Sequence, residues 1–154
     1  MYEISSTHCP HVRRLLRAAA EEVTLAVVSD DQLSCVSAPF AIDKKHALGE
    51  EENRLILNLR KMNMWVRTEH FTLPTLGRVL PYLRRGQWAC VIDLKGAHNH
   101  LPLAEDTKTW LGIRNGNIWY QCQSVPFGLN CAPQEWQRMM IPVLNYMRNL
   151  GALI

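Results

Sequence analysis

The dipeptide Asn115-Gly116 lies between two short apolar runs, 110–114 and 117–122, and this pattern constrains the fold more than any other feature of the chain. Asn-Gly is a favoured pair for the two-residue turn of a β-hairpin, because both residues tolerate a positive φ angle. The flanking runs contain aromatic and β-branched residues, which favour strands. The sequence therefore predicts a tight antiparallel hairpin over 110–122.

A second hairpin is predicted nearer the N-terminus. The stretch 34–42 is expected to be an edge strand, because Pro39 has no N–H group to donate to a central ladder. Residues 43–53 are polar and turn-like, and residues 54–60 are again apolar. This order predicts two strands that are joined by a charged loop.

The second hairpin carries cations on both arms, with Lys44 and Lys45 on the first arm and Arg54 on the second. Cations placed in this way can converge on a phosphate group. They can equally balance the three glutamates at 50–52 across the loop. This segment alone favours neither interpretation.

An amphipathic helix is predicted from residue 10 to about residue 28, because apolar side chains recur there at helical spacing. Arg13, Arg14 and Arg17 occupy the opposite side. The simplest interpretation of this basic face is a solvated surface, and contact with phosphate is the alternative.

Two further helices are predicted in the second half of the chain, over 72–85 and 132–150. Each contains a proline that a helix interior does not suit. Pro81 should kink the first of these helices, and Pro142 should bend the second. Hairpins and helices together predict an α+β fold, in which helices pack on an antiparallel sheet.

The apolar run Cys90-Val91-Ile92 is followed directly by Asp93. The run predicts a buried strand with a carboxylate at the point where the strand ends. A buried carboxylate is costly unless it is hydrogen-bonded, paired or bound to a cation. An aspartate after a strand is most often a turn or capping residue, so the interpretation of Asp93 depends on the surrounding segments.

Composition limits the class of protein. A chain of 154 residues with 47% hydrophobic and 20% charged residues can build one folded domain and is unlike a disordered protein. The net charge of +3 permits a nucleic-acid partner without requiring one. No apolar run is long enough to span a bilayer, and the N-terminus lacks the layout of a signal peptide. The five scattered cysteines are typical of reduced thiols, so we expect an intracellular protein of the cytoplasm or nucleus.

Four blocks of the chain stand in a fixed order, at 39–45, 54–63, 93–103 and 125–133. In order and rough spacing they resemble the motifs of the reverse transcriptase family. The match is closest to retrotransposon enzymes, and among these to the tyrosine-recombinase-encoding (DIRS-like) elements. The resemblance covers about 34–151, and 142–151 is also similar to that subgroup.

The resemblance implies a catalytic centre and a triphosphate site. Asp93 would be the catalytic residue and would hold two Mg²⁺ ions, helped by the backbone carbonyl of Leu94. Lys44 or Lys45 would bind the triphosphate of the incoming nucleotide together with Arg54. The resemblance thus favours the phosphate interpretation of the basic hairpin.

Two further contacts are implied by the resemblance. His98 would lie under the sugar of the nucleotide, while Phe127 and Gly128 would lie beside the nascent base pair, where glycine allows close approach of the backbone. The template strand would run along five consecutive residues, which are Thr72, Leu73, Pro74, Thr75 and Leu76.

The fold implied is the right-hand fold of reverse transcriptases. Fingers and the first part of an incomplete palm would occupy 34–154, after an N-terminal amphipathic helical segment over 1–33. The implied partners are an RNA or DNA template–primer and deoxynucleoside triphosphates. The remaining palm and thumb, and nuclease or recombinase domains of a parent polyprotein, are further implied partners, and a membrane is not.

The sequence departs from the family at three places. His98 stands where the family has Tyr or Phe, and Asn58 stands where many members have Asp. The second catalytic motif, x-x-Asp-Asp, is not found before Ile154. Because a two-metal site needs more than one carboxylate, we expect that this chain alone does not polymerise. The alternatives are a non-catalytic nucleic-acid-binding remnant and a pseudogene product without selected activity.

Overall fold

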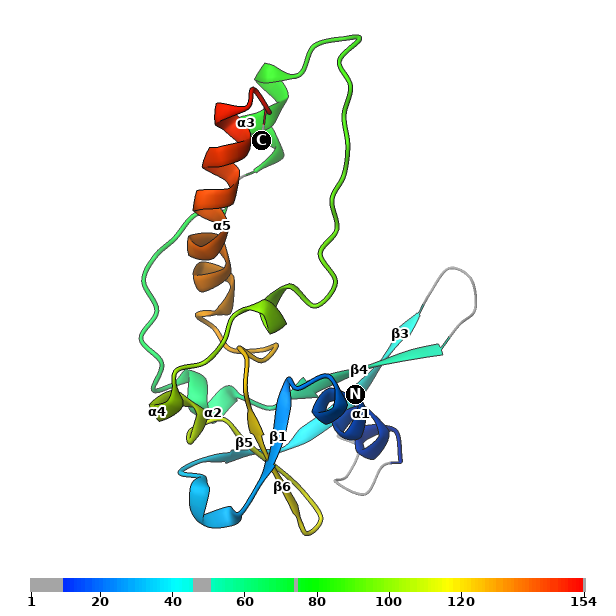
Figure 1. The fold of residues 1–154 in the computed structure, drawn as a ribbon, viewed down its shortest axis with the longest axis vertical. Coiled ribbons are helices and arrows are strands. Elements are labelled where there is room, and N and C mark those ends of the chain that lie inside the picture. Colours follow the sequence, from blue (N-terminus) through cyan, green and yellow to red (C-terminus); the bar gives the residue numbers. More distant parts are fainter. Residues whose placement is uncertain (1–9, 46–50, 74, 154) are drawn as a thin grey trace.

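In the computed structural model, which describes residues 10–45, 51–73 and 75–153 (for 43–45 and 51–52 only the backbone), two small sheets and one helix form a body. The long helix α5 (Ala132–Asn149) projects from this body (Figure 1). The segments 64–73 and 75–95 lie outside the body, and α3 (Leu76–Val79) is beside the far end of α5 (Figure 1). The predicted α+β class is confirmed.

The larger sheet has four strands in the order β1 (Leu25–Val28), β6 (Ile118–Cys122), β5 (Gly112–Asn115) and β2 (Val36–Ser37). Neighbouring strands are antiparallel except β2 and β5, which are parallel. The predicted hairpin over 110–122 is confirmed as β5 and β6.

The turn of this hairpin lies one residue later than predicted. Asn115 pairs with Ile118, so the two loop residues are Gly116 and Asn117 rather than Asn115 and Gly116. Gly116 has φ 63°, and Asn117 has no positive φ. This is the pattern of a type II′ turn, which needs glycine at its first central position and fits the twist of the strands.

The helix predicted from residue 10 to about residue 28 is wrong in its second half. The helix α1 (Pro10–Glu21) ends early, and Val23 has φ 60° just after it. The Thr24 hydroxyl donates a hydrogen bond to the carbonyl oxygen of Ala19 at 2.9 Å, which closes the helix end. The following residues form β1, because valines favour a strand and β6 offers a free edge to pair with. A short 3₁₀ turn, η1 (Asp30–Gln32), comes next.

The hairpin predicted in the first half of the chain forms as β3 (Pro39–Lys45) and β4 (Glu51–Leu57), but its bounds differ from the prediction. Residues 43–45 and 51–53, predicted as loop, are strand, and residues 58–60, predicted as strand, are not. The stretch predicted as one strand over 34–42 is divided between β2 and β3, which lie in different sheets. A single helical turn, α2 (Arg60–Asn63), follows β4. The backbone register places Lys44 opposite Glu52 and Lys45 opposite Glu51, which is the arrangement that charge balance across the loop requires.

The helix predicted over 72–85 is wrong in its extent. Only α3 (Leu76–Val79) and the 3₁₀ turn η2 (Leu80–Tyr82) form, with Pro81 inside the 3₁₀ turn. Leu76 is 69% exposed and Leu80 is 55% exposed. Short helices in proteins depend on burial of an apolar face, and this segment buries too little to support a longer one.

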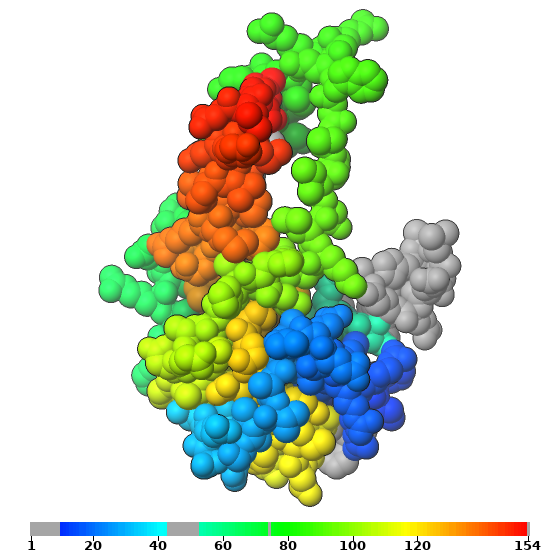
Figure 2. Space-filling view, viewed as in Figure 1, coloured from blue at the N-terminus to red at the C-terminus, as the bar shows by residue number. Residues whose placement is uncertain are grey.

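The buried strand predicted at 90–92 is also wrong. The backbone has no assigned strand, no described strand pairs with it, and Val91 is 96% exposed. An apolar run becomes a buried strand only where a neighbour covers it. The light-green stretch that carries this run is separated from α5 by a gap (Figure 2). The chain returns to the body through η3 (Ala97–His100) and α4 (Glu105–Lys108).

One hydrophobic core holds the body together. It combines Val12 and Leu16 of α1 with residues of both sheets and of the loops around them, and α1 contacts β1, β3 and β4. The helix predicted over 132–150 is confirmed as α5, which continues through Pro142. Its first turn reaches the core at Ala132, whereas Val143 and Tyr146 are exposed. Among the described residues, no helix has the length and hydropathy needed to cross a membrane.

Candidate functional site

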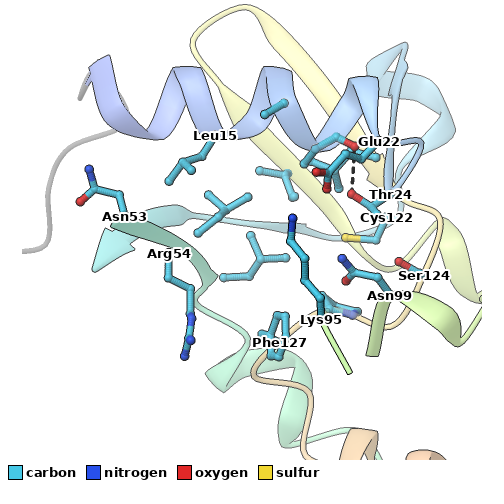
Figure 3. A pocket seen from close by; sticks show the side chains of 17 residues that line it. Leu15, Glu22, Thr24, Asn53, Arg54, Lys95, Asn99, Cys122, Ser124 and Phe127 are labelled. Atoms are coloured by element: carbon cyan, nitrogen blue, oxygen red, sulfur yellow. Dashed lines mark hydrogen bonds between the residues drawn. The ribbon is translucent and has the colours of Figure 1, made fainter. Parts of the chain in front are cut away.

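A cleft of about 330 Å³ opens between α1, β4 and the segments that carry Lys95 and Phe127 (Figure 3). Its wall at α1 is mostly apolar, and its deep side is closed by core residues such as Ile113 and Cys122. The polar and charged side chains that line it come from six places in the sequence, and they include Glu22, Thr24, Asn53, Arg54, Lys95, Asn99 and Ser124.

Two cations and one carboxylate set the charge of the cleft. Lys95 extends into it, while Arg54 lies at its margin near Phe127 (Figure 3). Among the described residues neither cation has an ion-pair partner, so both are free to meet an anion. Glu22 lines the same cleft and reduces the net positive charge to about one unit. The arrangement suits a ligand with a phosphate at one end.

The loop that contains Phe127 forms one wall. The Phe127 ring lies 5.0 Å from the His98 ring, centroid to centroid, and His98 in turn lies 6.4 Å from Trp136 of α5. Gly128 has φ 101° and approaches β4 so closely that a Cβ there would be 3.4 Å from the carbonyl oxygen of Leu57. Glycine is therefore favoured at this position by the backbone angle, while a Cβ would meet β4 only at van der Waals contact.

Burial determines the protonation of two groups in this region. Desolvation lowers the pKa of His98, so the ring is neutral at pH 7, and its buried Nδ1 has no hydrogen-bond partner. Burial raises the pKa of Cys122 to about 12, so its thiol stays protonated and is not a nucleophile. Cys122 therefore lines the cleft as a neutral thiol.

The residues predicted for metal binding lie elsewhere. Asp93 and Leu94 are exposed on the segment that leads to Lys95, and neither lines the cleft. Within the described ranges, no three His, Cys, Asp or Glu side chains gather as a metal site would need. The donor set for two Mg²⁺ ions is therefore incomplete in this part of the chain.

The predicted template segment runs beside α5. The carbonyl oxygen of Thr72 accepts a hydrogen bond from Gln137 of α5 at 3.1 Å, and Thr72, Leu73, Thr75 and Leu76 are exposed. Pro74 lies outside the described residues, as do the side chains of Lys44 and Lys45. Of the residues predicted to bind nucleotide, Arg54 and Phe127 line the cleft. His98 contacts the Phe127 ring and Gly128 follows it in the chain, but neither lines the cleft.

Two residues of this site were missed by the sequence analysis. Lys95 lines the cleft. The signal that could have found it is its position two residues after Asp93, inside the block 93–103. Asn63 hydrogen-bonds to the loop of Phe127, and no local pattern around it indicated such a contact.

Comparison with known proteins gives polyproteins of transposons and of viruses among the relatives. The chain is 30% identical over 112 residues to the retrovirus-related Pol polyprotein from transposon gypsy of Drosophila melanogaster, which covers 70% of the chain and 11% of the relative. It is 24% identical over 128 residues to the corresponding polyprotein from transposon 412, covering 81% of the chain and 10% of the relative. It is 24% identical over 156 residues to the polyprotein from transposon 297, covering 99% of the chain and 14% of the relative.

These three homologues are Pol polyproteins of retrotransposons. The chain spans between 10% and 14% of the length of these three relatives, so it corresponds to one small region of such a polyprotein. No family model matches it. The similarity supports the retrotransposon part of the resemblance and leaves the enzyme type and the DIRS-like subgroup as predictions.

Proposed function

We propose that this chain is part of the RNA-directed DNA polymerase, or reverse transcriptase, of a retrotransposon polyprotein. It would contribute the fingers and the first part of the palm of a right-hand fold. One observation carries the proposal: Arg54 and Phe127, assigned to the incoming nucleotide from separate motifs, line the same cleft together with Lys95. The similarity to Pol polyproteins supports the same origin.

In this proposal the cleft binds a deoxynucleoside triphosphate. Arg54 and Lys95 neutralise phosphate charge, and Phe127 and Gly128 lie beside the base pair, with His98 under the sugar. A neutral imidazole can stack there without adding positive charge. The described part of the predicted template segment, which is held on α5 at Thr72, would contact the template.

Catalysis is not assigned to the described residues. Asp93 and the carbonyl of Leu94 remain the proposed contribution of this chain to a Mg²⁺ site, but they do not complete it. We therefore expect the chain 1–154 to bind nucleotide without polymerising it. Templated nucleotide addition by the purified chain in a primer-extension assay would contradict this expectation.

Nucleotide binding is tested by titrating the chain 1–154 with dATP in a calorimeter. Substitution Arg54→Ala should weaken binding about tenfold or more, because it removes a charge-assisted contact. Substitution Arg14→Ala is the matched control, since it removes the same charge from an exposed position of α1 that does not line the cleft. Equal effects of the two substitutions, or no binding by the unmodified chain, would refute the proposal.

A second candidate function is nucleic-acid binding without catalysis. It is favoured by Arg13, Arg14 and Arg17, which are all exposed on α1. This candidate predicts RNA binding that ignores sequence and weakens steeply with salt. Replacement of these three arginines by alanine should then abolish binding, whereas Arg54→Ala should leave most of it, so the two candidates are separable by the same assays.

A further inference from the structure

A set of three hydrogen bonds joins α2 to the loop of Phe127. Asn63, the last residue of α2, donates from Nδ2 to the carbonyl oxygen of Gly128 at 2.8 Å. Its Oδ1 accepts from the backbone N–H of Asn130 at 3.0 Å. The side chain of Asn130 donates from Nδ2 to the carbonyl oxygen of Asn63 at 3.2 Å. Both ends of the Asn63 amide are thus used by one loop.

The backbone of Asn63 is connected to the hydrophobic core through Leu59. The backbone N–H of Asn63 donates to the carbonyl oxygen of Leu59 at 2.8 Å, and the Leu59 side chain is buried. The backbone from which Asn63 reaches the loop is therefore tied to a residue of the core. Donating to Gly128 and accepting from Asn130 at the same time requires a donor and an acceptor on one short planar group. Among the side chains, only Asn has both on an amide of this length.

The loop itself needs an anchor at this point. On its upstream side the backbone N–H of Val125 donates to the carbonyl oxygen of Leu101 at 2.9 Å. Beyond Val125, the loop carries Phe127 into the wall of the cleft and Gly128 against β4, with a backbone angle that most residues avoid. The bonds from Asn63 hold the downstream side, so the loop is fixed at both ends.

We propose that Asn63 is a positioning residue, whose side-chain amide holds the Phe127–Gly128 loop in the place where it forms the wall of the cleft. The consequence for nucleotide binding rests on the function proposed above, whereas the hold on the loop does not. Asn63 lines no part of the cleft and acts through Gly128 and Asn130.

The test combines amide hydrogen exchange, measured by NMR on the chain 1–154, with dATP titration. Asn63→Leu keeps the approximate size of the side chain and removes the two hydrogen bonds that the side chain makes, to Gly128 and from Asn130. The Asn130 amide should then exchange about tenfold faster or more, and dATP binding should weaken about fivefold or more. Exchange in the core strand at Ile113 should not change, which distinguishes a local release from general destabilisation.

Two further variants sharpen the result. Asn63→Asp keeps the acceptor for the Asn130 N–H but loses the donor to Gly128, so its Asn130 exchange should lie between those of the unmodified chain and Asn63→Leu. Asn149→Leu makes the same chemical change at the exposed end of α5 and should alter neither measurement.

Each outcome decides the proposal. Unchanged exchange at Asn130 in Asn63→Leu would overturn the hold on the loop. Faster exchange with unchanged dATP affinity would overturn its role in the cleft. If the unmodified chain binds no dATP, the proposed function fails, and exchange at Asn130 still decides whether Asn63 holds the loop.

Discussion

Substitution Gly128→Ala should destabilise the chain and weaken nucleotide binding together. Gly128 has φ 101°, a value that L-residues rarely adopt. A residue forced into such a backbone region costs about 1–3 kcal/mol. The added Cβ would lie 3.4 Å from the carbonyl oxygen of Leu57 and 3.9 Å from Cδ1 of Leu59, which is tight but not a clash, so backbone strain is the main cost. The free energy of unfolding should fall by about 1–3 kcal/mol.

The assay is urea denaturation followed by dATP titration of each variant. Gly86→Ala is the matched control, because Gly86 has φ 87° but no atom lies within 4 Å of its Cβ position, and it is on an exposed segment. That strain can relax locally, so Gly86→Ala should change the unfolding midpoint little and dATP affinity not at all. Gly128→Asn should recover part of the lost stability, since Asn tolerates positive φ better than Ala does.

The reasoning is refuted if Gly128→Ala unfolds at the same urea concentration as the unmodified chain and binds dATP equally well. That result would mean that the Phe127–Gly128 loop does not hold this backbone conformation in solution. Equal losses of stability in Gly128→Ala and Gly86→Ala would mean that the loop is no better fixed than the exposed segment.

Three other predictions concern the body, α5 and His98. Leu16→Ala should lower the free energy of unfolding by about 2–5 kcal/mol in urea, and Leu15→Ala by less, because Leu16 is fully buried and Leu15 only partly. Arg138→Ala breaks the 2.8 Å ion pair with Glu69, so limited proteolysis should cut near Glu69 faster, with a change in stability below about 1 kcal/mol. Because burial lowers the pKa of folded His98 below 6.5, the unfolded state binds more protons, so stability should fall as the pH drops below 6.5. Urea midpoints should show this loss, and His98→Phe should reduce it.

The parts of the fold that the sequence predicted correctly are those whose signal is local. The hairpin of β5 and β6, the hairpin of β3 and β4, and α5 each follow from turn residues or periodicity within one stretch. Even the misplaced turn is a local matter, since a II′ turn needs glycine first and Asn115 could then join the strand.

The errors occurred where the outcome depends on a distant partner. Residues 25–28 became a strand because β6 was available to pair, and 90–92 stayed unpaired because no described strand lies beside it. Nothing within either run distinguishes these outcomes. The same holds for the site: motifs pointed to Arg54 and Phe127, whereas the contacts of Asn63 connect α2 to a loop more than sixty residues away and have no local signature.

The cleft and the segment that carries Asp93 differ in how much of their surroundings is buried. The cleft residues Arg54 and Phe127 stand on a body with a closed core, and Asn63 holds one wall in place. Asp93 stands on a segment whose apolar side chains face solvent, including Val91 and Ile92, so nothing described fixes its carboxylate. A metal site needs ligands held in a defined geometry, whereas a phosphate can be met by flexible cations. We infer that nucleotide binding and chemistry on the nucleotide are separable here: Asp93→Asn should leave dATP affinity in the absence of Mg²⁺ unchanged, and a large loss would show that Asp93 is already organised with the cleft.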